Sequence, residues 1–160
     1  MSHVAPTGQP SQRKKVLAVA SGGGHWVQLL RLREAFADHD VVFVTTHAMY
    51  AQDVPGDRMH VVPDATRWDR WRVLRLALSI VRVVAREKPD VVISTGAAPG
   101  CLAVIFARLR GARTVWIDSI ANVHRLSMSG RLVRRFADLW LTQWPHLETE
   151  DGPEYAGKVF

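Results

Sequence analysis

The chain has 160 residues, which is enough for one domain with a core but too few for two nucleotide-binding domains that close around a substrate. Apolar residues make up 48% of it and charged residues 22%, a globular composition that excludes general disorder. Lys and Arg total 21 against 15 Asp and Glu, giving a formal charge of +6. Such a basic chain indicates an anionic partner, which leaves nucleic acid, anionic lipid and phosphorylated substrates open.

Residues 1–14 are polar and contain Pro and Gly, which predicts a disordered head. The apolar run that follows, 16–20, is far shorter than the core of a signal peptide, and no run approaches the ~18 apolar residues of a membrane span. Cys101 is the only cysteine, so neither an intrachain disulfide nor a cysteine-based zinc site can form. We therefore expect a cytosolic protein.

Strand-like and helix-like patterns alternate along the rest of the chain. Strands are predicted at 16–20, 41–45, 59–62, 91–94, 114–117 and 139–142. Helices are predicted at 25–37, 66–87, 99–109 and 131–136, and the acidic, Gly- and Pro-containing segment 148–160 is typical of a linker-like tail. This alternation predicts an α/β fold with an open, doubly wound parallel sheet. The loops expected to meet at its ligand-binding edge are 21–25, 45–50, 95–100 and 118–130.

The first of these loops contains three consecutive glycines. It reads Ser21-Gly22-Gly23-Gly24-His25. Glycines let backbone amides approach an anion, and the helix that follows adds a partial positive charge at its first turn. The alternative is a tight turn in which His25 caps the helix or is merely exposed. The loop lacks the Gly-Lys-Ser/Thr of a nucleoside-triphosphate loop, and Val27 stands where a dinucleotide fingerprint needs its third glycine.

The loop after the fourth predicted strand is also made of small residues. It reads Ser94-Thr95-Gly96-Ala97-Ala98-Pro99-Gly100. Because the next helix points its amino end at the same edge of the sheet, a second anion-facing loop is expected here. Close packing of helix on sheet is the alternative explanation for the small residues.

Arginines and tryptophans alternate at the start of the long helix predicted at 66–87. They are Arg67, Trp68, Arg70, Trp71, Arg72 and Arg75. Indoles at the headgroup level and guanidinium groups on lipid phosphates favour a membrane interface, while the second half of the helix can dock on the sheet. The alternative is a solvated basic helix with its tryptophans packed inward.

The strand predicted at 114–117 is followed by Asp118 and Ser119, and then by a polar segment that includes Arg125. Asp118 could accept hydrogen bonds from a sugar or position a base, and helix capping by Asp118 or Ser119 is the alternative. Asp38 and Asp40 resemble a metal-binding pair, but they precede a strand and so lie at the opposite edge. The histidines show no mutual ligand spacing, so no metal site is predicted.

Several motifs of this chain, taken together and in order over residues 15–160, resemble one family. They are Ser-Gly-Gly-Gly-His at 21–25, Thr-Gly-x-x-Pro-Gly at 95–100, Trp-Ile-Asp-Ser at 116–119, Arg-Leu-Ser-Met-Ser-Gly-Arg at 125–131, Ala-Asp at 137–138, Gln-Trp-Pro at 143–145 and Tyr-x-Gly-x-Val at 155–159. The family is that of the acceptor-side subunits of split N-acetylglucosaminyltransferases that build dolichol-linked glycans. The bacterial PssD-type subunits of exopolysaccharide synthesis are more similar still, and the single-chain MurG enzyme is a distant relative.

The resemblance implies a Rossmann-like fold, the N-terminal half of an inverting, metal-independent GT-B hexosyltransferase that is inactive without its partner. It implies a second subunit that carries the donor site for a UDP-sugar, a polyprenyl-diphosphate-linked sugar acceptor bound by this half, and no cofactor. The domain would span 15–147, and the tail 148–160 would face the partner.

By the same match, Gly22, Gly23 and Gly24 would cradle the acceptor diphosphate, and His25 would be the general base. Asp118 is a second catalytic candidate, although relatives commonly carry glutamate there. The further substrate contacts implied are Ser21, Thr95, Gly96, Pro99, Gly100, Ser119 and Arg125. Eukaryotic members carry an N-terminal membrane helix that this chain lacks, so peripheral binding to the inner face of the cell membrane is expected.

Two other classes of function stay open at this point. In a self-contained nucleotide-sugar or phosphate-binding protein, the glycine loops alone would suffice. A nucleic-acid-binding module would explain the arginine excess, but those arginines are concentrated on one predicted helix without a base-stacking set of aromatics. The resemblance argues against nucleic acid as the partner.

Overall fold

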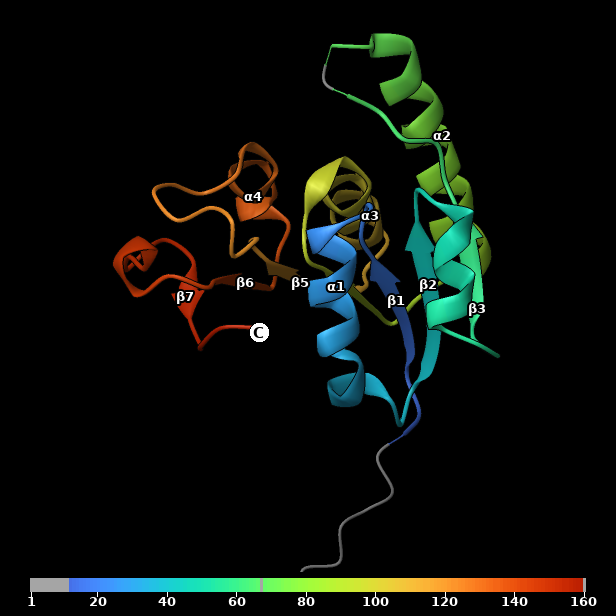
Figure 1. Ribbon diagram of the computed structural model, residues 1–160, viewed down its shortest axis with the longest axis horizontal. Coiled ribbons are helices and arrows are strands. Elements are labelled where there is room, and N and C mark those ends of the chain that lie inside the picture. Colours follow the sequence, from blue (N-terminus) through green and yellow to red (C-terminus); the bar gives the residue numbers. More distant parts are fainter. Residues whose placement is uncertain (1–11, 67, 160) are drawn as a thin grey trace, which may run out of the picture.

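The computed structural model describes residues 12–66 and 68–159, and its centre is a parallel sheet with the strand order β3-β2-β1-β4-β5-β6-β7 (Figure 1). The strands are β1 (Lys15–Val19), β2 (Asp40–Thr45), β3 (Arg58–Val61), β4 (Val91–Ser94), β5 (Arg113–Ile117), β6 (Leu139–Thr142) and β7 (Glu154–Tyr155). Continuous apolar runs form the central strands because both faces of the sheet are covered. The predicted fold class is therefore confirmed.

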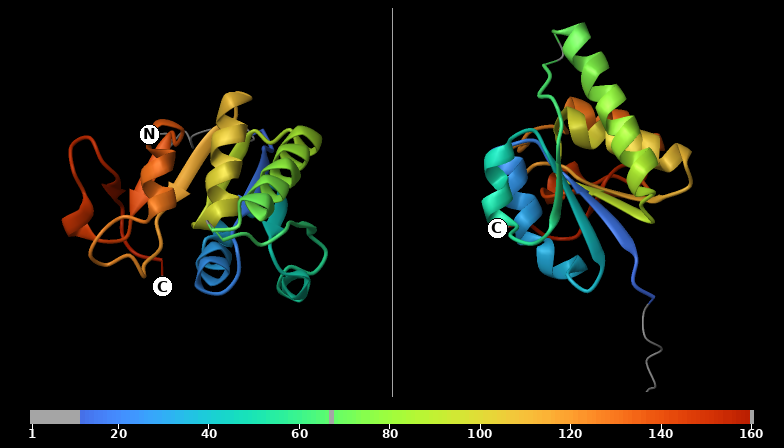
Figure 2. Two further views of the ribbon diagram at one scale, coloured as in Figure 1. Left: turned by 90° about the horizontal axis from the view of Figure 1, so that it is seen from above. Right: turned by 90° about the vertical axis from the view of Figure 1, so that its right-hand side faces the viewer.

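Helices cover both faces of the sheet. They are α1 (Gly24–Arg31), α2 (Arg70–Glu87), α3 (Ala97–Leu109) and α4 (Met128–Leu132), with 3₁₀ helices η1 (Arg33–Phe36), η2 (Ala48–Asp53), η3 (Val133–Arg135) and η4 (Pro145–Leu147). Seen from above, α1 and η2 lie on one face, and α2, α3 and α4 lie on the other (Figure 2). Each face has its own apolar core, one around Trp26 and Phe43 and one around Leu76 and Trp116.

Several predicted boundaries were wrong, and the helix expected at 131–136 is instead α4, which begins at Met128, followed by the 3₁₀ helix η3. Three further differences have local reasons. The helix expected at 25–37 ends at Arg31, because the chain changes to 3₁₀ hydrogen bonding where Leu32 donates to the carbonyl of Leu29. The helix expected from 66 begins only at Arg70, where the side chain of Asp69 accepts the amide of Arg72 as an N-cap. The linker-like tail contains β7, which pairs with β6.

The strand order places a topological switch point between β1 and β4. From β1 the chain continues outward to β2 and β3, returns to the other side of β1 as β4, and then continues outward through β5, β6 and β7. At a switch point the loops that leave the two adjacent strands diverge and open a crevice at the carboxyl edge. The two predicted glycine loops, after β1 and after β4, flank this point.

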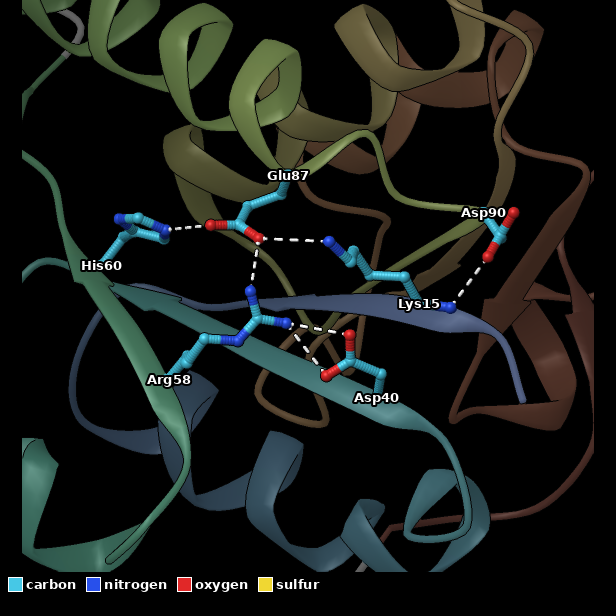
Figure 3. Close-up of polar contacts among 6 residues, drawn as sticks. All are labelled: Lys15, Asp40, Arg58, His60, Glu87 and Asp90. Carbon is cyan, nitrogen blue, oxygen red and sulfur yellow. Dashed lines mark hydrogen bonds and ion pairs between the residues drawn. The ribbon is translucent and has the colours of Figure 1, made fainter.

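A charge cluster at the opposite, amino edge of the sheet fixes the carboxyl end of α2 (Figure 3). Glu87 is 5% exposed and accepts from Arg58 Nη1 at 3.0 Å and from His60 Nε2 at 2.8 Å, with Lys15 Nζ at 3.6 Å. Arg58 also pairs with Asp40, at the start of β2. Burial alone would raise the pKa of Glu87, but the hydrogen bond from His60 and the charges of Arg58, His60 and Lys15 together hold it below its usual value.

Candidate functional site

His25 and Thr95 join the two loops at the switch point. The Nδ1 atom of His25 lies 2.9 Å from the carbonyl oxygen of Thr95, and the hydroxyl of Thr95 donates to the carbonyl of His25 at 2.7 Å. Because a carbonyl can only accept, Nδ1 carries a proton, so in the neutral form of the ring the lone pair lies on Nε2. Half-buried at the first turn of α1, His25 can therefore take up a proton at this edge.

Only glycine fits at position 96, beside this imidazole. Gly96 has φ of 135°, and a Cβ atom there would lie 2.5 Å from both Cε1 and Nδ1 of His25. The next residue, Ala97, has φ of 65°, a left-handed conformation that is uncommon for a residue with a side chain. The loop after β4 is thus shaped for close approach of the His25 ring. Such local backbone strain favours a functional role for this loop over that of a simple connecting turn.

The glycine loop after β1 is contacted by the segment that follows β2. The sequence placed this segment, as the loop 45–50, at the ligand-binding edge but named no site residue in it. The amide of Gly23 donates to the Tyr50 hydroxyl at 2.8 Å, and a Cβ on Gly22 would lie 2.7 Å from the ring of His47. Gly23 and Gly24 are exposed, and nothing lies within 4 Å of a Cβ built on either. The surface of the loop at Gly23 and Gly24 is therefore accessible, although the Gly23 amide is already bonded to Tyr50.

Pro99 and Gly100 are buried, although the sequence placed them among the substrate contacts. Both lie in the first turns of α3, and a Cβ on Gly100 would fall 1.8 Å from the hydroxyl oxygen of Ser94. Close contact between helix and sheet explains this glycine, which was the alternative left open by the sequence. Thr95 and Gly96, also buried, remain beside His25.

Asp118 holds the loop that follows β5 rather than projecting into the crevice. It is 1% exposed, and its carboxylate accepts the amide of Ser127 at 2.8 Å and the hydroxyl of Ser127 at 2.5 Å. Ser127 in turn caps α4, because its hydroxyl oxygen accepts the amide of Gly130. This geometry favours a positioning role for Asp118 over a catalytic one. Arg125, in the same loop, is exposed.

A buried amide pair, Gln28 and Gln143, ties the remaining loops together. Gln143 belongs to the Gln-Trp-Pro motif at 143–145, but no pattern predicted its pairing with Gln28. Nε2 of Gln143 donates to Oε1 of Gln28 at 2.5 Å and to the carbonyl of Asp118 at 2.9 Å. Gln28 also donates to the hydroxyl of Ser119, a predicted substrate contact that is only 6% exposed. The Oε1 atom of Gln143 accepts the amide of Val159, which fixes the carboxyl-terminal tail. Four segments are thus connected behind the crevice.

The exposed face of α2 carries an apolar stripe. The stripe consists of Trp71, Leu74, Leu78 and Val81, and these side chains are 40–76% exposed. Their spacing of three and four residues places them on one side of the helix, whereas Leu76 and Ile80 pack against the sheet. Trp68 is 79% exposed, so the alternative that these tryptophans pack inward is wrong.

Exposed arginines accompany the apolar stripe along α2. They are Arg70, Arg72, Arg75, Arg82 and Arg86. Arg67, which the sequence grouped with them, lies outside the described residues. The amino end of α2 projects beyond the carboxyl edge of the sheet, the edge to which the glycine loops belong (Figure 1).

Residues 12–66 and 68–159 contain neither a metal-binding cluster nor a membrane-spanning helix. No group of three or more His, Cys, Asp or Glu side chains there is arranged to hold a metal ion. In the same residues no helix is both long enough and apolar enough to cross a membrane. Burial raises the pKa of the Cys101 thiol to about 11, so this thiol stays protonated at neutral pH and is a poor nucleophile.

The parallel sheet, its switch point and the two facing loops define the Rossmann-like domain found in GT-B proteins. Acinetobacter baumannii MurG has the same arrangement, with a TM-score of 0.71 and 16% identity, over 88% of this chain and 44% of MurG. A putative UDP-N-acetylglucosamine 2-epimerase from Listeria monocytogenes follows, with a TM-score of 0.63 and 15% identity, over 82% of this chain and 39% of the epimerase. The chain thus spans less than half the length of these proteins, and the likeness concerns the fold.

Sequence comparison gives the family. Residues 58–159 match the family described as "Oligosaccharide biosynthesis protein Alg14 like". The UDP-N-acetylglucosamine transferase subunit ALG14 of Mus musculus is 25% identical, over 94% of this chain and 85% of its own length. The chain belongs to the Alg14-like family of oligosaccharide biosynthesis proteins, which confirms the resemblance seen in its motifs.

Proposed function

We propose that this protein is the acceptor-side subunit of a two-chain glycosyltransferase. It would bind a polyprenyl-diphosphate-linked sugar at the membrane and recruit a second subunit that supplies the UDP-sugar, in exopolysaccharide or lipid-linked oligosaccharide synthesis. The observation that carries the proposal is the pairing of His25 with Thr95 across the switch point, in a chain of the Alg14-like family. A relative in Mus musculus is named as a UDP-N-acetylglucosamine transferase subunit.

His25 would act as the general base of the transfer. With Nδ1 donating to the Thr95 carbonyl, Nε2 is free to accept the proton of the acceptor hydroxyl as its oxygen attacks the anomeric carbon of the donor sugar. The bond from that carbon to the UDP oxygen breaks, UDP leaves with the electron pair, and the configuration inverts. The proton then passes from Nε2 to solvent. Backbone amides and helix ends would meet the diphosphate charge without a metal ion.

The glycine loop would hold the acceptor diphosphate. Gly23 and Gly24 are exposed, and α1 directs its positive end at the same place. A phosphate bound there would keep the attached sugar beside His25, which is the next residue along α1. Such fixed positioning is a large part of enzymatic rate enhancement.

Membrane contact would come from α2. The apolar stripe and its arginines match a helix that lies in the lipid interface, with indole and leucine side chains inserted and guanidinium groups on lipid phosphates. Because the amino end of α2 projects beyond the edge that carries the glycine loops, a lipid-borne diphosphate would reach these loops from the same membrane surface.

The test is reconstitution. The chain is expressed in its native host with an affinity tag, and the protein that co-purifies with it is identified and produced separately. We expect transfer of radiolabelled sugar from UDP-sugar to polyprenyl-diphosphate-linked acceptor only when both chains are present. Turnover by the single chain would overturn the two-chain proposal. A chain that runs alone in gel filtration and binds nucleotide sugar by itself would instead support the self-contained binding protein.

A further inference from the structure

We propose that Tyr50 is a substrate-binding residue that donates a hydrogen bond from its hydroxyl to the diphosphate held by the glycine loop. The inference rests on the proposed function. It adds the segment between β2 and β3 to an acceptor site that otherwise consists of the loops after β1 and after β4. Neither the glycine motif nor its spacing predicts this residue, because Tyr50 is brought to the loop only by the fold.

The hydroxyl of Tyr50 is a donor with no protein acceptor. Its oxygen already accepts the amide of Gly23 at 2.8 Å, so its proton must point away from that amide. Within residues 12–66 and 68–159, this hydroxyl donates no hydrogen bond, and the His47 ring lies beside the phenol edge-on with centroids 5.9 Å apart. Since Gly23 is exposed and Tyr50 is half-buried, the free proton is presented at the mouth of the glycine loop.

The phenol ring is held in place before any ligand arrives. It stacks on the indole of Trp26 with ring centroids 5.0 Å apart, and Nε1 of Trp26 donates to Asp53, at the end of η2, at 2.9 Å. Trp26 is itself 1% exposed in the core beneath α1. The hydroxyl is therefore fixed relative to the loop amides, which lowers the entropy lost when it binds a ligand.

A second hydroxyl in the same segment also lacks a partner within the part of the chain that the structure describes. The hydroxyl of Thr46, a residue 9% exposed at the end of β2, is buried without a hydrogen-bond partner among the described residues. Buried hydroxyls are rarely left unpaired, and those that are tend to mark a place where a ligand or ordered water completes the structure. The next residue, His47, places its exposed ring against Gly22.

The ligand chemistry that fits is a diphosphate. With the Gly23 amide held by Tyr50, a diphosphate can accept the Tyr50 proton on one oxygen and the Gly24 amide at the first turn of α1 on another. Hydrogen bonds to charged groups are the strong ones. Two diphosphates take part in the proposed reaction, one on the acceptor lipid and one in the UDP-sugar. We assign Tyr50 to the diphosphate of the acceptor lipid. The glycine loop that Tyr50 contacts leads directly into His25, and His25 must lie beside the acceptor hydroxyl.

Calorimetric titration of the full chain with geranyl diphosphate and, separately, with UDP tests the assignment. In Tyr50→Phe the ring still stacks on Trp26 while the donor is lost. We expect geranyl diphosphate to bind at least about tenfold more weakly to Tyr50→Phe than to the parent, with UDP binding unchanged. Tyr155→Phe, which changes the only other tyrosine, in β7, is the matched control and should bind as the parent does.

Each other outcome counts against the proposal. Unchanged or tighter binding of geranyl diphosphate by Tyr50→Phe would overturn it, and tighter binding would mean that the hydroxyl merely covers the Gly23 amide. A loss confined to UDP would overturn the assignment to the acceptor. In NMR spectra of the parent, the ring resonances of Tyr50 and the amide resonances of Gly23 and Gly24 should shift on titration with geranyl diphosphate. The resonances of Tyr155 should not shift. A parent that shows neither binding nor these shifts would overturn the proposed acceptor site as well.

Discussion

His25 and Thr95 exchange two hydrogen bonds, 2.9 Å and 2.7 Å long, and so lock together two loops that leave the sheet on either side of its switch point. One bond selects the tautomer of the imidazole, and the other holds the backbone that carries it. The arrangement resembles the backbone-oriented histidines of many catalytic sites, where the partner of one ring nitrogen decides what the other can do.

Replacing His25 with Asn separates these two roles. The Asn amide can still donate toward the Thr95 carbonyl, but it cannot accept a proton at neutral pH. We expect the reconstituted pair to lose roughly 10²–10⁴-fold in kcat, the usual range for a general base, while subunit pairing stays intact. Transfer assays and gel filtration measure the two effects. His39→Asn, at the amino edge, is the control, and turnover of His25→Asn equal to the parent's would remove His25 from the mechanism.

Gly96→Ala should damage the same site without touching a functional group. The new methyl would fall 2.5 Å from the His25 ring in a backbone conformation with φ of 135°, so the ring must move or the loop must open. We expect a loss of about 2–4 kcal/mol in the free energy of unfolding and a loss of transfer activity. Gly111→Ala is the control. Gly111 has φ of 88°, but the space around it is open, so this substitution measures the effect of backbone strain alone. Equal effects of the two changes would show that contact with His25 is unimportant.

Glu87→Gln should make stability less sensitive to acid. The folded-state pKa of Glu87 lies below its unfolded value of ~4.3, so its carboxylate stabilises the fold above that pH and loses this contribution as pH falls through the lowered pKa. At pH 7 we expect Glu87→Gln to lose about 2 kcal/mol, because charge-assisted bonds from Arg58 and His60 become neutral ones.

Urea unfolding of both proteins between pH 7 and pH 3 measures this difference. The gap between the parent and Glu87→Gln should narrow as the pH drops below about 4. Glu150→Gln, in an exposed position, should follow the parent throughout. A gap that stays constant with pH would contradict the lowered pKa of Glu87.

The order of the strands and helices could be read from the sequence because both signals are local. Buried parallel strands are continuous apolar runs, and 91–94 and 139–142 were predicted to the residue. The two glycine loops followed directly, since loops after such strands share one edge. By contrast, β7 is two residues long and has no apolar run, so only its pairing with β6 reveals it.

The contacts that complete the site could not be predicted in this way, because they join distant segments through single side chains. Gln28 and Gln143 are 115 positions apart, and a buried glutamine has no periodic signature. Tyr50 reaches Gly23 across 27 positions from a 3₁₀ helix that the sequence did not predict. Asp118 was correctly placed at the edge, but its burial depends on Ser127, whose position is set by the packing of α4.

Gln143→Met should free the carboxyl-terminal tail. The substitution keeps volume but removes the bonds to Gln28, Asp118 and the amide of Val159. Leaving these buried groups unpaired should lower the free energy of unfolding by about 2–4 kcal/mol and release residues 156–159. Hydrogen exchange of the Val159 amide should then approach that of an open chain. Gln52→Met, in the exposed part of η2, is the control, and a protected Val159 amide in Gln143→Met would show that other contacts hold the tail.

Polar substitutions in the apolar stripe of α2 should abolish membrane binding without loss of fold. Trp71→Ser and Leu78→Ser remove side chains that are 76% and 46% exposed, so the core on the other side of the helix is untouched. Burying each in lipid contributes on the order of 2 kcal/mol, so the double variant should bind vesicles hundreds of times more weakly. Flotation with vesicles of phosphatidylcholine and phosphatidylglycerol measures this. Leu109→Ser changes a leucine that is 70% exposed at the end of α3, and it should float like the parent. If the double variant also floats like the parent, α2 is not the membrane anchor.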